Sequence, residues 1–459
     1  MKRIFIALVM LIVTGSIGLR AQQKAWTLEE CISYALQNNI QIKQQEITTE
    51  YQQSTLDLSK LSLLPTVNGS ASHDYSFNRA LNQATYEVVE GKRTQSNNFY
   101  VGSDMTLFKG LVNYNTIKKN QYQLLASEQD LQNFKDNISL NIALAYLQIL
   151  LNNELVTATQ AQVELTKEQI EHTRKLVDAG SLAKGNLLDI ESQAAREELQ
   201  LVNMQNQLTM SYLALAQMLE LTDINNFKVL IPVISIDPEN ISSNPDSIFV
   251  VAQKHRPEIL SAEYQLKSAE YDLAIARGGR SPELSLSASA RTNYSDAKTY
   301  DYTAGEYVDP DPFGAQLKDN KFYAVGFSLN VPIFNGWRVN TNIRNSKLGI
   351  ENSKYTLESA KKQLYKNIQQ AYTDANGALK QYYASKKAVE SMEEAYRYAE
   401  QKFNVGLLTA VDYNQSKTQL LNAQSEMAQA KYEYVFKSKV LDFYRGIPLT
   451  LQQIGILAK

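Results

Sequence analysis

Few residues in this 459-residue chain have the type and spacing that catalysis or metal binding requires. The three histidines, His73, His172 and His255, are scattered and match no ligand spacing of a metal site. Cys31 is the only cysteine, so it can form no intrachain disulfide, and a small buried side chain is its expected role. No nucleophile–base pair or phosphate-binding loop is present either. The sequence therefore predicts a protein that is not an enzyme, with no catalytic, metal or cofactor site.

The net charge and the targeting signal exclude further classes of protein. The formal net charge is −2 and the pI is about 6.1, which argues against a nucleic-acid partner. Residues 1–21 combine a basic start, an apolar run over 4–13 and small residues up to Ala21, and this pattern predicts a secretory signal peptide. The run is shorter than the roughly 20 residues of a membrane-spanning helix. No later segment reaches that length, so we expect any membrane-inserted part to be β-structure.

Two pairs of segments alternate strictly between polar and apolar residues. Residues 65–77 place only polar side chains on one face, and residues 282–295 alternate serines with leucines and alanines. Alternation of polar and apolar residues with a period of two predicts strands with one solvent-facing side and one apolar side. A second alternating segment follows each, at about 98–109 and about 321–334. Each pair therefore predicts a hairpin joined by a long polar loop.

The chain also repeats itself. A shift of 217 aligns Pro65 with Pro282, and a shift of 226 aligns Gly110 with Gly336. The difference falls between the two strands of each pair, where insertions in exposed loops are tolerated. We therefore predict two equivalent repeats, 22–242 and 243–459.

A very long helix is expected after each hairpin, at about 112–178 and about 338–404. Apolar residues recur there every seven positions: Ile117, Leu124, Leu131 and Ile138 in the first, and Ile343, Ile350, Leu357 and Leu364 in the second. This period is typical of coiled-coil packing. At about 1.5 Å per residue each helix is on the order of 100 Å long. Each ends at a glycine turn, beyond which a second helix follows, at about 186–221 and about 410–445.

Four strands cannot close a membrane-spanning barrel, and an open strand edge in lipid leaves backbone groups unpaired. The chain must therefore oligomerise if it enters a membrane, and physical reasoning alone allows two, three or four copies. Aromatic residues are expected at the two membrane interfaces. The candidates are Tyr75, Phe77, Phe99, Tyr294 and Tyr323 at the loop end, and Phe108, Phe334 and Trp337 at the helix end. The alternative is a soluble four-stranded sheet whose apolar face packs on helices.

Two segments carry a family resemblance. The segment 401–412, QKFNVGLLTAVD, resembles the helical-tip motif of the TolC family of outer membrane efflux proteins, and 26–39 resembles that family's opening helix. The resemblance covers essentially the whole chain after residue 21. It implies a homotrimer in the outer membrane, with a 12-stranded barrel, four strands from each chain, continued by an α-helical coiled-coil barrel in the periplasm. The implied function is the outer membrane channel of a tripartite efflux or type I secretion system.

The same resemblance implies partners and contact residues. A periplasmic adaptor would bring substrate from an inner-membrane transporter of the RND, ABC or MFS type. The adaptor would dock on the two glycine turns, at Gly180, Leu182, Asn186, Gly406, Leu408, Thr409 and Asp412. Asn186 departs from the family pattern, which usually carries aspartate six residues after the glycine. The alternative interpretation is purely structural: both glycines adopt the left-handed conformation that ends a helix.

A resting channel must also be shut. The resemblance implies polar and ionic contacts between inner helices near the tip, and the nearest candidates are Arg397, Glu400, Lys402 and Asp412. Charged residues on long helices are more often simply solvated. The competing class of function is a non-conducting coiled-coil protein of the cell envelope. The sequence identifies neither the substrate nor the particular pump.

Overall fold

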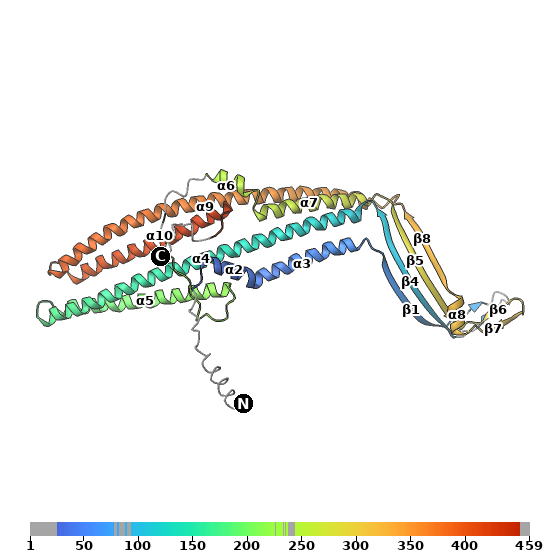
Figure 1. Ribbon diagram of the computed structural model, residues 1–459, viewed down its shortest axis with the longest axis horizontal. Helices are drawn as coiled ribbons and strands as arrows, with labels where there is room; N and C mark the ends of the chain where they lie inside the picture. Colours follow the sequence, from blue (N-terminus) through green and yellow to red (C-terminus); the bar gives the residue numbers. More distant parts are fainter. Residues whose placement is uncertain are drawn as a thin grey trace, which may run out of the picture. The chain divides into compact units, whose positions relative to one another are not determined.

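The structure is a computed structural model that describes residues 25–77, 80–81, 88–89, 93–224, 226–232, 234, 236 and 244–449. It consists mainly of long helices, with one four-stranded sheet and two short hairpins (Figure 1). The predicted signal peptide over 1–21 lies outside the described residues. Among the helices that are described, none has both the length and the apolar character needed to cross a bilayer.

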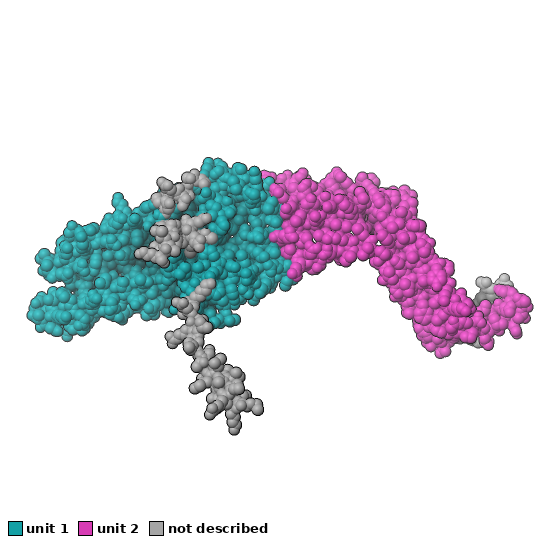
Figure 2. Space-filling view, in the orientation of Figure 1, with its two compact units in different colours: residues 1–47, 129–260, 359–459 teal, residues 48–128, 261–358 magenta. Residues whose placement is uncertain are grey.

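Contacts divide the chain into two compact units (Figure 2). Unit 1 contains residues 1–47, 129–260 and 359–459, and unit 2 contains residues 48–128 and 261–358. Each unit draws segments from both halves of the sequence. The units therefore do not follow the repeat boundary, and the repeats 22–242 and 243–459 stay a prediction.

The two longest helices have the same length. Helix α4 (Val112–Asp178) and helix α9 (Arg338–Asn404) each contain 67 residues. Both begin after two residues with positive φ: Gly110 and Leu111 precede α4, and Gly336 and Trp337 precede α9. A bulky residue in the left-handed region is uncommon, so its occurrence at both equivalent positions marks a shared sharp turn from strand to helix.

A large apolar core lies in unit 1. Helices α2 (Leu28–Asn38), α4, α5 (Lys184–Met218) and α10 (Ala410–Tyr444) contribute to it. Tyr146 is buried there and its hydroxyl donates to the carbonyl of Leu230 at 2.5 Å. Thr27 and Glu30 form a capping box that fixes the start of α2. A short helix, α6 (Pro245–Ala252), also belongs to this unit.

Unit 2 contains the sheet. Its strands are β1 (Thr66–Phe77), β4 (Arg93–Lys109), β5 (Glu283–Ser295) and β8 (Phe322–Asn330). They are antiparallel in the order β1-β4-β5-β8, so β1 and β8 are the edges. Two connecting helices, α3 (Ile40–Leu61) and α7 (Pro257–Gly278), lead toward β1 and β5. The predicted combination of long helices and four strands per chain is confirmed.

Two strand boundaries differ from the prediction. Strand β4 begins at Arg93 rather than near 98, because residues 93–97 pair with the end of β1. Strand β8 ends at Asn330 rather than near 334, because Pro332 has no N–H to donate to a strand ladder. A β-bulge between Thr106 and Phe108 shifts the register at the end of β4.

The loops between paired strands contain structure that the sequence did not indicate. The first loop includes strands β2 (Ala80–Leu81) and β3 (Val88–Val89). The second includes β6 (Thr299–Asp301), β7 (Glu306–Val308) and α8 (Phe313–Asp319). Helix α8 is fastened to β5, since Thr292 donates to the carbonyl of Leu317 at 2.8 Å and Asn320 donates to that of Asn293 at 2.9 Å.

Candidate functional site

The two glycine turns of unit 1 are built in the same way. Helices α4 and α5 form one hairpin, and α9 and α10 form the other (Figure 1). Gly180 has φ +75° and Gly406 has φ +76°. The N–H of Gly180 donates to the carbonyl of Val177, and that of Gly406 to the carbonyl of Phe403, both at 2.9 Å. In each turn the next residue donates to the carbonyl five positions back, which completes a Schellman-type helix end.

The helices that follow the turns start differently. Thr409 caps α10: its hydroxyl accepts from the N–H of Asp412 at 3.2 Å and donates to the Asp412 carboxylate at 2.7 Å. The equivalent cap of α5 is Ala183, which has no side-chain hydrogen bond. Asn186 only donates its N–H to the carbonyl of Ala183. The second tip is therefore capped by side chains and the first is not.

Behind the turns lies a small apolar cluster. Its buried members are Ile190, Phe403, Ala410 and Tyr413, with Ile170, Tyr396 and Leu408 packed against them. The hydroxyls of Tyr396 and Tyr413 are 2.6 Å apart, and burial raises the pKa of both. The cluster joins all four helices of the two hairpins.

Leu408 is therefore half-buried beneath the second turn, as is Leu182 beneath the first. Among the large apolar residues of the tips the most exposed is Leu407, at 78%. The sequence did not single it out, because neighbouring leucines look alike until the turn determines which one faces the cluster. Gly180 and Gly406 are themselves exposed, and nothing lies within 4 Å of the position where a Cβ would stand.

The four gate candidates do not meet within this chain. Arg397 pairs with Glu394 on its own helix at 2.6 Å. Asp412 bonds to Thr409, and Glu400 and Lys402 are exposed. Within the described part of the chain, no ion pair joins any two of the four candidates.

The predicted interface aromatics all lie in unit 2. Tyr75 and Phe77 end β1, and Tyr294 lies near the end of β5. Phe99 and Tyr323 lie deeper in the sheet, opposite Thr292 and Ala290. At the other end Phe108 is opposite Leu284, while Phe334 and Trp337 follow β8 and are exposed.

A buried charged pair near the tips was missed by sequence reasoning. Lys417 of α10 is 2% exposed and its Nζ lies 3.8 Å from a carboxylate oxygen of Glu197 on α5. Thr166 of α4 accepts from Lys417 and donates to Glu197. Burial lowers the pKa of Lys417, although the Glu197 carboxylate opposes this effect. The partners are far apart in sequence, so no local pattern could have revealed them.

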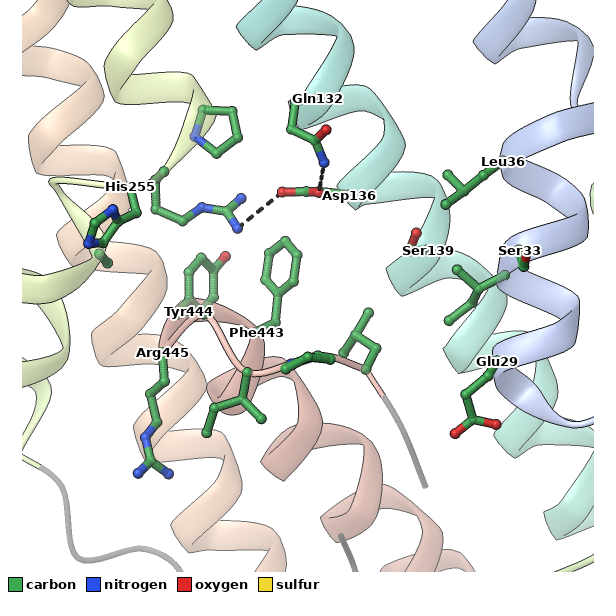
Figure 3. A pocket seen from close by; sticks show the side chains of 18 of the residues that line it. Glu29, Ser33, Leu36, Gln132, Asp136, Ser139, His255, Phe443, Tyr444 and Arg445 are labelled. Atoms are coloured by element: carbon green, nitrogen blue, oxygen red, sulfur yellow. Dashed lines mark hydrogen bonds and ion pairs between the residues drawn. The ribbon is translucent and has the colours of Figure 1, made fainter. Parts of the chain in front are cut away.

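A cavity of about 700 Å³ also lies in unit 1 (Figure 3). Arg256 is buried beside it, with its guanidinium 3.5 Å from Asp136 and 4.1 Å from the ring centre of Phe443. Asp136 also accepts from Gln132 at 2.7 Å. Burial raises the pKa of Asp136 despite these partners. Arg256 and Asp136 are therefore already paired, and Arg256 links α4 to α10 through its contacts with Asp136 and Phe443.

Comparisons with known proteins agree with this arrangement. The family described as outer membrane efflux protein matches residues 31–220 and 249–446. The outer membrane protein TolC of Escherichia coli is 25% identical over 340 residues, covering 71% of this chain and 64% of that relative. The outer membrane efflux protein BepC of Brucella suis is 21% identical, covering 94% of this chain and 87% of that relative. The structure of the Campylobacter jejuni CmeC outer membrane channel superimposes with a TM-score of 0.76 at 19% identity, covering 91% of this chain and 85% of that one. At that identity the likeness shows the fold alone.

Proposed function

This chain belongs to the outer membrane efflux protein family, and we propose that it forms the outer membrane channel of a tripartite efflux or type I secretion system. The channel conducts substrates from a periplasmic adaptor and an inner-membrane transporter to the cell exterior. It does no chemistry on its cargo. The long loops face outward and the helices project into the periplasm, as is usual for outer membrane proteins.

The observation that carries this proposal is the incomplete sheet. Both edges, β1 and β8, lack a strand partner within the described residues. Strand β8 is antiparallel to β5, which is parallel to β1, so β8 of one copy can pair antiparallel with β1 of the next. Three copies then supply 12 strands and leave no edge open to lipid.

The apolar face of the sheet is evidence that the sheet inserts into lipid. On β8, Tyr323, Val325, Phe327 and Leu329 lie on one face and are exposed in the single chain. From Leu284 to Tyr294 the sheet rises about 33 Å along the strand, which a tilt of about 40° reduces to about 25 Å. That height equals the apolar band of an outer membrane barrel. We therefore propose the aromatic residues at the two ends of the sheet as its membrane-interface residues.

The helical tips are the proposed adaptor-docking surface. They comprise Gly180, Leu182, Asn186, Gly406, Leu408, Thr409 and Asp412, to which the geometry adds Leu407. Support comes from the exposed glycines and from Leu407, an apolar side chain held outward by a well-defined turn. Arg397, Glu400, Lys402 and Asp412 are exposed enough to pair between copies, and we propose them as the gate.

Fractionation and conductance test the channel. The mature protein is expected in the outer membrane as heat-modifiable trimers that conduct ions in a planar bilayer. A soluble monomer without affinity for detergent micelles would contradict the proposal. Trimers that never conduct would favour the structural coiled-coil alternative.

Substitution at the tip tests docking separately. Leu407→Ser removes the projecting side chain without touching the cluster beneath it, so trimers and conductance should remain while adaptor-dependent transport is lost. Leu199→Ser is the matched control, because Leu199 is also exposed but lies on α5, well away from the turns. Transport by Leu407→Ser at the level of the control would remove Leu407 from the docking surface.

A further inference from the structure

One row of residues on the polar face of the sheet is unlike its neighbours. Ser70 pairs with Tyr100, Tyr100 with Arg291, and Arg291 with Phe322, so these four side chains share one face and one level. The adjacent rows on that face contain small or polar side chains: Asn68, Gly102, Ser289 and Ala324 on one side, and Ser72, Asn98 and Asn293 on the other. Two aromatic rings and a guanidinium thus interrupt a face of small residues.

The guanidinium of Arg291 stacks on an aromatic ring but has no acidic partner in the described part of the chain. Its central carbon lies 4.5 Å from the centre of the Phe322 ring. Within the described residues it has no ion pair and no hydrogen bond. A guanidinium that stacks by its face on a ring keeps its N–H groups, which lie in its own plane, available to a carboxylate.

Gly102 leaves space for the side chain of Tyr100, because glycine has no Cβ. A Cβ on Gly102 would stand 2.6 Å from the Cζ of Tyr100, so the tyrosine ring lies across Gly102 on the same face. Glycine in a strand interior often marks such a close approach. The Tyr100 ring therefore extends along the sheet from the row of Arg291 toward the row of Gly102 and Ser289.

The acidic residues of this face do not cancel the charge. Asp104 pairs with Ser287, and Asp74 is at the level of Ser295, each four residues along β5 from Arg291. At about 3.3 Å per residue both positions lie about 13 Å from Arg291 along the strand, more than the Debye length of physiological salt. Among the described residues, Arg291 is the one charged residue of its row.

We propose that Tyr100, Arg291 and Phe322 form a binding subsite in the channel wall for aromatic solutes that carry a carboxylate. The inference rests on the proposed function, because the closed trimer turns the polar face inward and brings three copies of this row to one level. Arg291 pairs with the carboxylate through its planar N–H fork, and the two rings stack on the aromatic body. The subsite selects solutes by charge and shape as they pass through the channel.

Block of the channel by 2-naphthoate tests the subsite. The full-length trimer is reconstituted in a planar bilayer, and 2-naphthoate is compared with neutral 2-naphthalenemethanol. We expect 2-naphthoate to block the wild-type channel at a lower concentration than the neutral compound. Arg291→Gln should raise the half-blocking concentration of 2-naphthoate about tenfold, the value of one charge-assisted hydrogen bond. It should also shift the reversal potential in a KCl gradient toward cation selectivity.

Two further variants and a control sharpen the result. Arg291→Lys keeps the charge but loses the planar fork, so the reversal potential should stay while block weakens. Phe322→Ala should weaken block by both compounds. Arg93→Gln is the matched control, because Arg93 also stacks on a ring, that of Tyr75 at 4.7 Å, but lies on the opposite face. It should behave as wild type.

The outcomes separate the two proposals. A conducting Arg291→Gln channel with unchanged block and reversal potential overturns the subsite and leaves the channel intact. Equal effects of Arg93→Gln and Arg291→Gln also overturn it. Absence of conductance in the wild-type protein overturns the channel, and the subsite with it.

Discussion

Cys31 is the single thiol of the chain and is fully buried in the core of unit 1. Burial, with a smaller contribution from Glu30, raises the pKa of Cys31 to about 12. At pH 8 only about one thiol in ten thousand is then ionised, and the thiolate is the reactive form. We expect no labelling by a maleimide within hours at pH 8, measured by intact mass, and full labelling in denaturant. Rapid labelling of the native protein would contradict the burial of α2.

Gly406 and Gly377 give opposite expectations for the same substitution. Nothing lies within 4 Å of a Cβ at either position, but Gly406 has φ +76° and Gly377 lies inside α9. Gly406→Ala should destabilise the turn by about 1 kcal/mol, because an L-residue resists the left-handed conformation. Gly377→Ala should stabilise its helix by about 0.5–1 kcal/mol. Amide hydrogen exchange should be faster around residue 406 and slower around residue 377, and a shared direction would contradict the conformational argument.

The buried pair of Lys417 and Glu197 marks the limit of prediction at this scale. A lysine and a glutamate on long helices are normally solvated, and Glu197 lies among other charged residues, Arg196 and Glu198. Their burial depends on three helices meeting near the tips, with Thr166 between them. Sequence reasoning found the turns because glycine is required there locally. It missed the pair because only tertiary packing creates it.

At the scale of elements, the two tip hairpins share a turn but not a cap. Thr409→Ala should remove the hydrogen bond to Asp412 and cost about 1 kcal/mol at the start of α10. Ala183→Thr should give α5 the cap that it lacks and stabilise it by a similar amount. Amide exchange in the first turn of each helix measures both effects. If the wild-type first turn of α5 proves as protected as that of α10, the difference between the tips is not one of capping.

The spacing of apolar residues carried most of the element prediction. The seven-residue apolar period indicated both 67-residue helices, and period-two alternation indicated the four sheet strands. The ends of β4 and β8 were less predictable, since β4 extends as far as β1 can pair with it. Helix α8 lies in a polar loop and is fixed by hydrogen bonds to β5. Such long-range bonds leave no local period in the sequence.

At the scale of the whole molecule, the assignment of faces decides whether the sheet can enter a membrane. Val325 and Ala324 are neighbours on β8 but point to opposite faces, and Val325 is 75% exposed in the single chain. Val325 pairs with Ala288, about midway between the aromatic ends of the sheet. In the proposed trimer its face would meet lipid near the bilayer centre, whereas the face of Ala324 would line the water-filled interior.

Arginine at these two positions should therefore have unequal effects. Val325→Arg places a charge in hydrocarbon at a cost of about 2–4 kcal/mol per chain, and three copies in a trimer multiply that cost. Ala324→Arg adds the same side chain to the polar face, where water can solvate it. We expect Val325→Arg to deplete heat-modifiable trimers from the outer membrane fraction and Ala324→Arg to leave them near wild-type abundance. Equal depletion by the two variants would show that both faces are packed against protein, as in a soluble sheet. Stronger depletion by Ala324→Arg than by Val325→Arg would show that the apolar face of β8 points inward.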